Sequence, residues 1–268
     1  MPAVVREHAR RRSGVSVSGA PPEHALAARV RAARRDPSLA VLEGLHALKH
    51  ALRFGARVDA VLAPDPAAVA ALARAVAPDV AERIEALVQP VHPALASELA
   101  PRAPDPAVLA IARRPAVGLE RVLADPRSAP IVFLEDPRSL GNLGACVRVA
   151  AAAGAAGLLS TGSHDPWHPD VLRGAAGLHY ALPVMRTDGP PPCDRPLLAL
   201  DPGGEPLRPA VLPPRALLAF GGERHGLGAA LLAAADARVA LPMRAGVSSL
   251  NLATSVAAVL YAWRLRDA

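Results

Sequence analysis

Short apolar runs that alternate with helix-forming segments restrict the fold of this 268-residue sequence more than any other feature. In the first part, strands are expected at 38–44, 58–63 and 107–112 and helices at 45–55, 65–77 and 92–100. In the second part, strands are expected at 131–136, 156–160, 182–186, 196–201, 216–222 and 238–243. Continuous apolar strands are typical of a parallel sheet that is covered on both faces. The alternation therefore predicts an α/β fold.

The segment "ARRPAVGLERVLADPRSAP", rich in proline and arginine, separates the two parts. We predict a basic, flexible arm over residues 1–36 and a small α/β domain over 37–112. A linker over 113–127 would then lead to a larger α/β domain over 128–268.

Composition indicates a reduced, cytoplasmic protein. The chain has only two cysteines, Cys146 and Cys193, too few for a disulfide framework. The residues after the basic start "MPAVVREHARRR" lack the apolar run of a signal peptide, and no run reaches about 18 apolar residues. We expect Cys146 to be a small core residue, and we expect no membrane partner.

Positive charge is concentrated at the N-terminus. Residues 1–57 contain 11 Lys or Arg against 4 Asp or Glu, whereas residues 58–268 contain 19 against 20. Arginine forks match phosphate geometry, so this excess indicates a polyanion partner, most simply nucleic acid. The candidate nucleic-acid-binding residues are Arg10, Arg11, Arg12, Arg29, Arg31, Arg34 and Arg35. A solvated basic tail without a specific partner is the alternative.

Familiar nucleotide and metal motifs are missing. The sequence has no P-loop and no G-x-G-x-x-G after a strand, which excludes the usual phosphate-binding loops. His164 and His168 lie four residues apart, but Pro166 and Pro169 interrupt any helix that would place both on one face. We therefore expect no bound metal.

Three segments carry polar residues at junctions between strands and helices. The first has Asn142 with Arg148 six residues later, the second has Glu223, and the third has Ser249 and Asn251. Taken singly, Asn142 and Ser249 are suited to cap helices, Glu223 to start one, and Arg148 to lie on a surface. Because α/β proteins place sites at the C-terminal edge of the sheet, their joint occurrence at junctions favours one functional site.

These segments resemble the three motifs of the SpoU (TrmH-type) branch of the SPOUT RNA methyltransferases. The matching stretches are "NLGACVR", "FGGERHGL" followed by "VALPM", and "GVSSLNLATSVAAVLY". The resemblance covers roughly residues 128–268, and residues 37–112 are similar to the small substrate-binding domain that often precedes them. One departure is Arg224, because many relatives have glycine after the glutamate.

The resemblance implies a parallel sheet with a deep trefoil knot, a homodimer with the site near its interface, and S-adenosylmethionine bound in the knot. By motif matching, Gly221, Leu241 and Leu250 would contact that cofactor, mainly through their backbone atoms. The implied reaction is methylation of a ribose 2′-hydroxyl in rRNA or tRNA.

The resemblance also implies catalytic roles for Asn142, Arg148, Glu223, Ser249 and Asn251. Because a guanidinium is a poor base at neutral pH, we favour Arg148 as a clamp on the phosphate beside the target ribose. The alternative is Arg148 as the base itself. Two other functions are an inactive RNA-binding relative and a small-molecule or protein methyltransferase.

Overall fold

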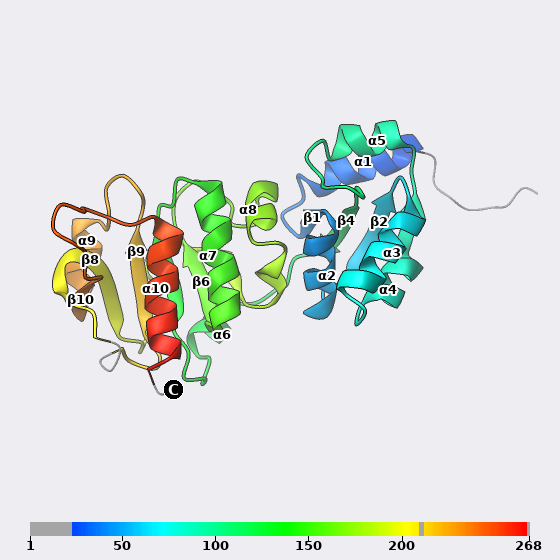
Figure 1. Ribbon diagram of the computed structural model, residues 1–268. Helices are drawn as coiled ribbons and strands as arrows, with labels where there is room; N and C mark the ends of the chain where they lie inside the picture. Colours follow the sequence, from blue (N-terminus) through cyan, green and yellow to red (C-terminus); the bar gives the residue numbers. More distant parts are fainter. Residues whose placement is uncertain (1–22, 209–211, 267–268) are drawn as a thin grey trace, which may run out of the picture.

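A computed structural model describes residues 23–208 and 212–266 of the chain. The described residues form two α/β units, each with its own sheet, that lie side by side (Figure 1). The sheet order is β1-β4-β2-β3 in the first unit and β10-β8-β9-β5-β6-β7 in the second. The α/β fold expected from the sequence is confirmed.

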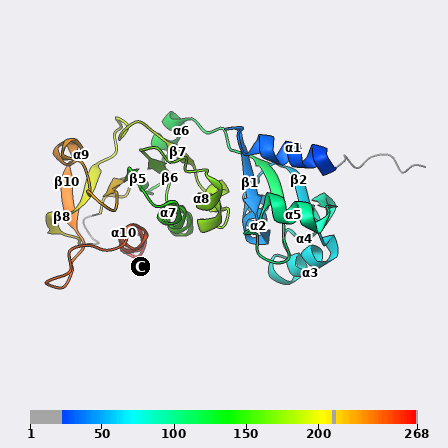
Figure 2. The same cartoon turned by 90° about the horizontal axis from the view of Figure 1, so that it is seen from above.

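The second unit is built on a sheet whose six strands are all parallel. The strands are β5 (Ile131–Glu135), β6 (Gly157–Ser160), β7 (Val184–Arg186), β8 (Leu197–Pro206), β9 (Leu217–Gly221) and β10 (Ala237–Ala240). Figure 2 shows α7 (Leu140–Ala153), α8 (Pro169–Gly174) and α10 (Leu252–Arg264) on one side of this sheet and α6 (Leu119–Leu123) and α9 (Ala229–Ala234) on the other. The central strands, β5 and β9, are consequently apolar along most of their length.

Local sequence explains where α7 and α10 begin and end. Ser139 caps α7, because its hydroxyl accepts a hydrogen bond from the backbone N–H of Asn142. Gly154 ends α7 in the left-handed conformation, at φ 79°. Asn251 caps α10 and accepts from the N–H groups of Ala253 and Thr254.

The first unit has a mixed four-stranded sheet. Its strands are β1 (Leu39–Glu43), β2 (Val58–Ala63), β3 (Val88–Pro90) and β4 (Leu109–Arg113), of which only β2 and β3 are parallel neighbours. Its helices are α1 (Glu23–Ala33), α2 (Leu45–Arg53), α3 (Pro66–Val76), α4 (Ala81–Leu87) and α5 (Pro93–Leu99). Asp65 caps α3 with Pro66 at its first position, and the helix falls within the range 65–77 that was expected from the sequence.

Helix α1 corrects one expectation. Residues 1–36 were expected to form a flexible arm, but Glu23–Ala33 is a helix that packs against the small sheet. Leu26 and Val30 are buried there with Val41 and Leu62 of the strands. The mean hydropathy of this helix is low because arginines cover its outer face, so its narrow apolar stripe gave a weak signal in the sequence.

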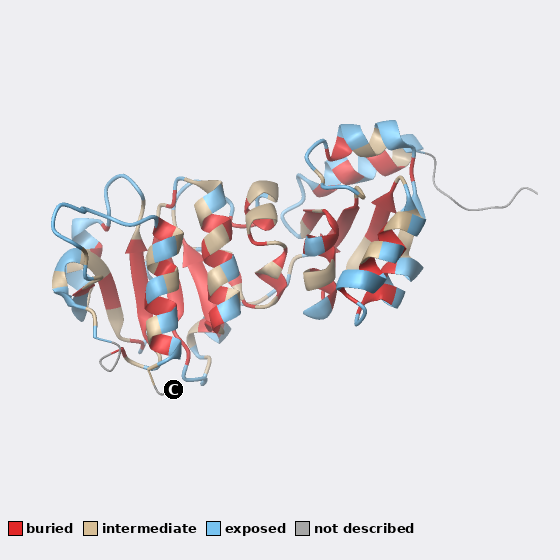
Figure 3. Cartoon of the chain, viewed as in Figure 1, coloured by how far each residue is buried: buried red, intermediate tan, exposed pale blue. Residues whose placement is uncertain are grey.

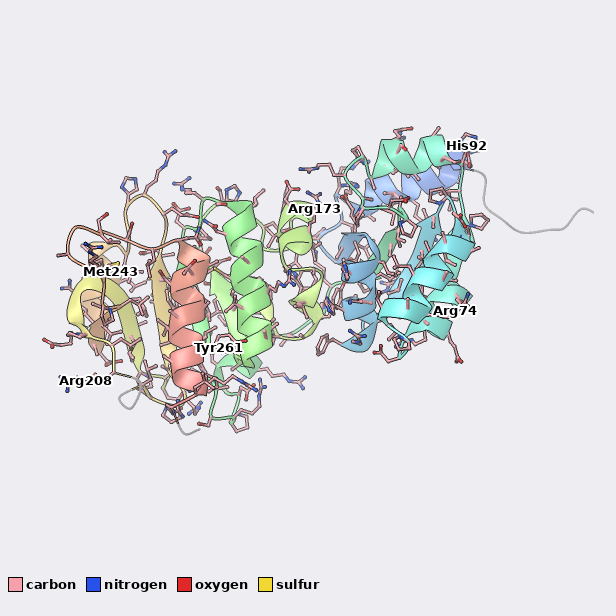
Figure 4. All side chains as sticks on the ribbon, viewed as in Figure 1. Arg74, His92, Arg173, Arg208, Met243 and Tyr261 are labelled. Carbon is pink, nitrogen blue, oxygen red and sulfur yellow. The ribbon has the colours of Figure 1, made fainter. Side chains whose placement is uncertain are left out.

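Apolar packing and ion pairs join the two units. Trp167, Leu172 and Tyr180 of the second unit are buried in the core cluster that contains Leu48 of α2. The carboxylate of Glu43 in β1 binds Arg173 of α8 at 3.1 Å, and Figure 4 shows Arg173 between the two units. The linker therefore connects units that are already in extensive contact.

No helix within residues 23–208 and 212–266 is long and apolar enough to cross a membrane.

The C-terminal helix α10 packs directly against α7. The trefoil knot implied by the resemblance stays a prediction.

Candidate active site

Three side chains from the three motifs meet in one hydrogen-bonded group. The side-chain amide of Asn142 in α7 donates to a carboxylate oxygen of Glu223 at 2.7 Å. The amide of Asn251 in turn donates to the side-chain oxygen of Asn142 at 3.0 Å. Glu223 follows β9 and Asn251 precedes α10, so the group joins two helix starts to one strand end. We call Asn142, Glu223 and Asn251 the polar triad.

The carboxylate of Glu223 also binds the N-terminus of α7. Its oxygens accept hydrogen bonds from the backbone N–H groups of Arg138 at 3.0 Å and Ser139 at 3.3 Å. Partial burial raises the pKa of Glu223, but the hydrogen bonds from Arg138, Asn142 and Ser139 outweigh this effect and hold the pKa below its ordinary value of 4.5. Glu223 is thus ionised at neutral pH.

Two of the helix-cap interpretations were wrong. Ser139 caps α7, which leaves the side chain of Asn142 free to bind Glu223. Asn251, and not Ser249, caps α10. Glu223 does act as a carboxylate at a helix start, but the helix is α7, which precedes it in the chain.

Two members of the polar triad, Glu223 and Asn251, border a cavity of about 610 Å³ at the C-terminal edge of the large sheet. All three residues expected to contact the cofactor, Gly221, Leu241 and Leu250, line this cavity. Glu223, Asn251 and the predicted catalytic residue Ser249 line it too. One part of the wall is apolar and consists of Met243, which Figure 4 labels, with Leu200, Phe220, Leu227, Val239 and Leu252. The polar side chains of Asp201, Arg224 and His225 line the cavity as well.

Close backbone contacts shape the turn after β9. A Cβ added to Gly221 would lie 2.0 Å from the carbonyl carbon of Gly226, so only glycine fits there. Glu135, at the end of β5, holds the far end of this turn by accepting a hydrogen bond from the N–H of Gly228 at 2.6 Å. The sequence analysis missed Glu135 and Ser139, although a carboxylate directly after an apolar strand was a signal for the first.

Arg148 lies apart from the polar triad within one chain. Six residues of helix separate Arg148 from Asn142 by about 9 Å along the axis and about 120° around it. The Arg148 side chain is exposed, and within residues 23–208 and 212–266 no hydrogen bond or ion pair engages it. Among the described residues, hydrogen bonds therefore join three of the five predicted catalytic side chains. Ser249 lies on the cavity wall, and Arg148 lies on the outer face of α7.

Most of the described N-terminal arginines make contacts within the protein. Arg29 donates to the carbonyl oxygen of Asp59 at 3.0 Å. Arg31 pairs with Glu98, and Arg34 pairs with Glu43 at 2.9 Å. Arg35 is exposed, and Arg10, Arg11 and Arg12 lie outside the described residues. RNA would have to compete with these internal partners for three of the seven predicted guanidinium groups.

Cys146 lies in the core beneath the polar triad's helix, α7. Cys146 is fully buried in α7, and burial, reinforced by the charge of Glu223, raises the pKa of its thiol to about 12. The small-core-residue interpretation of Cys146 is therefore confirmed. Among the described residues, no group of three or more His, Cys, Asp or Glu side chains is placed to hold a metal ion.

Comparison with known families assigns the second unit. Residues 129–261 match the model of the SpoU rRNA Methylase family, and this range contains the polar triad and the whole large sheet. The chain belongs to this family. The resemblance expected from the three motifs is thus confirmed.

Two relatives are named for activities on 23S rRNA. Over 170 residues, 58% of this chain, the sequence is 30% identical to a 23S rRNA (uridine(2479)-2'-O)-methyltransferase of Streptomyces viridochromogenes. Over 152 residues, 53% of this chain, it is 32% identical to a 23S rRNA (guanosine(2553)-2'-O)-methyltransferase of Bacillus subtilis. The chain spans about three fifths of the length of these relatives, 59% and 60% respectively.

A solved structure matches both units. It is the AdoMet-bound rRNA methyltransferase of Sinorhizobium meliloti, with a TM-score of 0.70 and 25% sequence identity. The match covers 91% of this chain and 95% of that chain. A small mixed sheet followed by a six-stranded parallel sheet is therefore an arrangement that family structures share.

Proposed function

We propose that this chain is an S-adenosylmethionine-dependent methyltransferase that acts on a ribose 2′-hydroxyl of rRNA or tRNA. The observation that carries the proposal is the polar triad, in which one residue from each of the three family motifs takes part in one hydrogen-bonded group beside a cavity of about 610 Å³. The named activities of the relatives from Streptomyces viridochromogenes and Bacillus subtilis support the reaction type.

The residues around the cavity fit S-adenosylmethionine. Phe220, Leu227 and Leu252 would offer an apolar wall to an adenine ring, and the carboxylate of Glu223 would favour a cationic sulfonium in the same cavity. Backbone groups at Gly221, Leu241 and Leu250 would hold the cofactor in place of a glycine-rich phosphate loop. When bound, the cofactor supplies a strongly electrophilic methyl group.

The protein side chains would bind and orient the ribose. The polar triad and Ser249 can hold the sugar through hydrogen bonds, with Glu223 ionised and fixed by the start of α7. We assign Arg148 to the phosphate beside the target ribose, where its fork can bind two oxygens. The proton of the hydroxyl would leave through that phosphate or through water, and Arg148 as the base itself is the alternative.

A homodimer is part of the proposal. Helices α7 and α10 lie side by side on one face of the molecule, and Figure 3 shows exposed residues along both. That face carries exposed apolar residues, with Tyr261 at 42% and Leu265 at 61% of their surface accessible. Arg148 is exposed on α7, so two-fold pairing of these helices would bring it to the interface, within reach of the partner's cavity.

The small unit would bind the substrate, and the whole protein would act in the cytoplasm. Methyl transfer from labelled S-adenosylmethionine to bacterial rRNA and tRNA tests the enzyme activity directly. Binding of RNA and cofactor without any transfer would instead favour an inactive RNA-binding relative. Transfer to a protein or a small molecule but to no RNA would contradict the proposal.

A further inference from the structure

Helix α2 presents cationic side chains on the face of the molecule that carries α7 and α10. Figures 1 and 2 show α10, α7, α8 and α2 along one side of the structure. His46, Lys49 and Arg53 follow each other in α2 at intervals of three and four residues, so they share one side of the helix. His46 is exposed, and Lys49 is partly exposed.

Among the described residues, two of these three groups form no ion pair with a carboxylate. Arg53 is neutralised, because its guanidinium donates two hydrogen bonds to the carboxylate of Asp79, both at 2.6 Å. Within residues 23–208 and 212–266, no ion pair engages His46 or Lys49. Lys49 is moreover the only lysine of the whole chain.

Helix α2 is fixed in position relative to the second unit. The ring nitrogen Nδ1 of His50 lies 2.8 Å from the carbonyl oxygen of Ala176. A Cβ added to Gly177 would lie 2.4 Å from the carbonyl oxygen of Ala47, so the two backbones are in direct contact. The short helix η1 (Leu178–Tyr180) follows and packs against both α2 and α7. The distance from α2 to α7 is therefore set by packed backbone.

The charges of Lys49 in α2 and Arg148 in α7 both act on His46. Desolvation lowers the pKa of His46, and the positive charges of Lys49 and Arg148 lower it further. Arg148 thus faces the same space as His46, although the two residues belong to different units. The lowered pKa keeps His46 neutral at neutral pH, where its ring can donate a hydrogen bond. The charge of Lys49 also lowers the pKa of Asp79, but Arg53 already binds that carboxylate. Lys49 and Arg148 therefore leave a net positive potential, which attracts an anion.

We propose that His46 and Lys49 of α2 form, together with Arg148 of α7, a phosphate-binding strip for the RNA backbone that leads to the target ribose. This inference rests on the proposed function, because it assigns the anion to the substrate RNA. A lysine ammonium binds phosphate as a compact point charge and reads no base, so the strip would position the RNA without selecting its sequence.

We expect the strip, and not the arginines of the N-terminal segment, to provide RNA affinity. Arg29, Arg31 and Arg34 are engaged within the small unit, whereas Lys49 is free to bind phosphate in the described structure. Because packing fixes α2 next to α7, phosphates on the strip would keep a constant spacing from Arg148. The strip would therefore guide the strand to the catalytic face.

The test compares Lys49→Ala with Arg121→Ala in the full-length protein. Each change removes one cation that forms no ion pair among the described residues, but Arg121 lies in α6, on the opposite side of the large sheet from α7, and is not part of the strip. The probe is deproteinised bacterial 23S rRNA, and its affinity is measured across a series of salt concentrations. Lys49→Ala should weaken binding about tenfold at low salt and reduce the slope of log K against log salt by about 0.7 to 0.9.

Controls separate a lost phosphate contact from a damaged fold. Lys49→Arg should restore the slope, and S-adenosylmethionine affinity should be unchanged in all three variants. If Lys49→Ala has the slope of wild type, the strip is wrong even though the methyltransferase proposal stands. If wild type neither binds nor methylates any RNA, the proposed function fails and the strip fails with it.

Discussion

The side-chain amide of Asn142 donates a hydrogen bond to Glu223 across 2.7 Å, although 81 residues separate the two in sequence. The same carboxylate accepts from the backbone N–H groups at the start of α7. Glu223 therefore ties the turn after β9 to the helix that carries Arg148, which makes it a positioning group for the whole site.

Replacing Glu223 by glutamine should lower turnover at least tenfold. The amide cannot accept from Arg138, Ser139 and Asn142 as a carboxylate does, because the hydrogen bonds lose their charge assistance. The free energy of unfolding should fall by about 1 kcal/mol. Initial rates and urea unfolding measure both effects, and Glu205→Gln, at an exposed carboxylate in β8, is the matched control. Unchanged turnover in Glu223→Gln would remove Glu223 from the site.

Glu223 should also make stability depend on pH. Its pKa in the folded protein lies below the ordinary 4.5, so its stabilising contribution is complete above that pH and is lost as the pH falls below it. The difference in unfolding free energy between wild type and Glu223→Gln should therefore shrink in acid.

How much of this site can be predicted from the sequence depends on how far apart in the chain the interacting residues lie. Strand β2 was predicted with its observed ends, Val58 and Ala63, because its apolar run is bounded by turn residues. The contact between Asn142 and Glu223 was not predicted, because pairing across 81 residues depends on strand order. The cap was misassigned for a local reason: Ser139 and Asn142 are both good caps, and only the structure shows which one precedes the first turn.

The arginines in and directly after α1 show a second limit of what the sequence can predict. Their charge indicated a polyanion partner, but Arg31 and Arg34 bind Glu98 and Glu43, which lie 67 and 9 residues away. The net charge of a segment includes these arginines as if they could bind a polyanion, even where carboxylates of the folded protein neutralise them. Lys49 was included in the same count, and its lack of a described acidic partner became visible only in the structure.

Because of His179, the free energy of unfolding should fall as the pH decreases into the mildly acidic range. Burial lowers its pKa to about 4 from 6.5, although a hydrogen bond to the carbonyl oxygen of Pro166 opposes the shift. The unfolded chain takes up a proton before the folded chain does, so this contribution is complete above pH 6.5 and decreases toward pH 4, by about 3 kcal/mol in total. Urea unfolding of wild type and His179→Phe between pH 7 and pH 4 measures it. Parallel pH profiles for the two proteins would contradict a neutral, buried His179.

Tyr261→Asp should separate the proposed dimer into monomers. Tyr261 is 42% exposed on α10, and a charge there would be buried unpaired at a two-fold interface. Light scattering during size-exclusion chromatography measures the mass. Phe54→Asp is the matched control, because Phe54 is 48% exposed but lies at the end of α2. A dimer that survives Tyr261→Asp and not Phe54→Asp would place the interface elsewhere.

Arg148→Ala and Arg148→Lys should both abolish methyl transfer while cofactor affinity stays near that of wild type. Arg148 is exposed and makes no described contact, so the fold does not depend on it. Lysine keeps the charge but loses the two-point grip on phosphate. Single-turnover rates and calorimetry separate the two effects. Near-normal turnover in Arg148→Lys would show that the phosphate-clamp role is wrong.

The most direct test of the account is transfer of a labelled methyl group from S-adenosylmethionine to bacterial rRNA and tRNA in buffer containing EDTA, followed by alkaline hydrolysis. A methyl group on the ribose 2′-oxygen removes the nucleophile that attacks the neighbouring phosphodiester. The account predicts that the label is recovered in an alkali-resistant dinucleotide from one position, without any added metal. Label on a base, in mononucleotides released by alkali, or transfer that disappears on chelation, would contradict it.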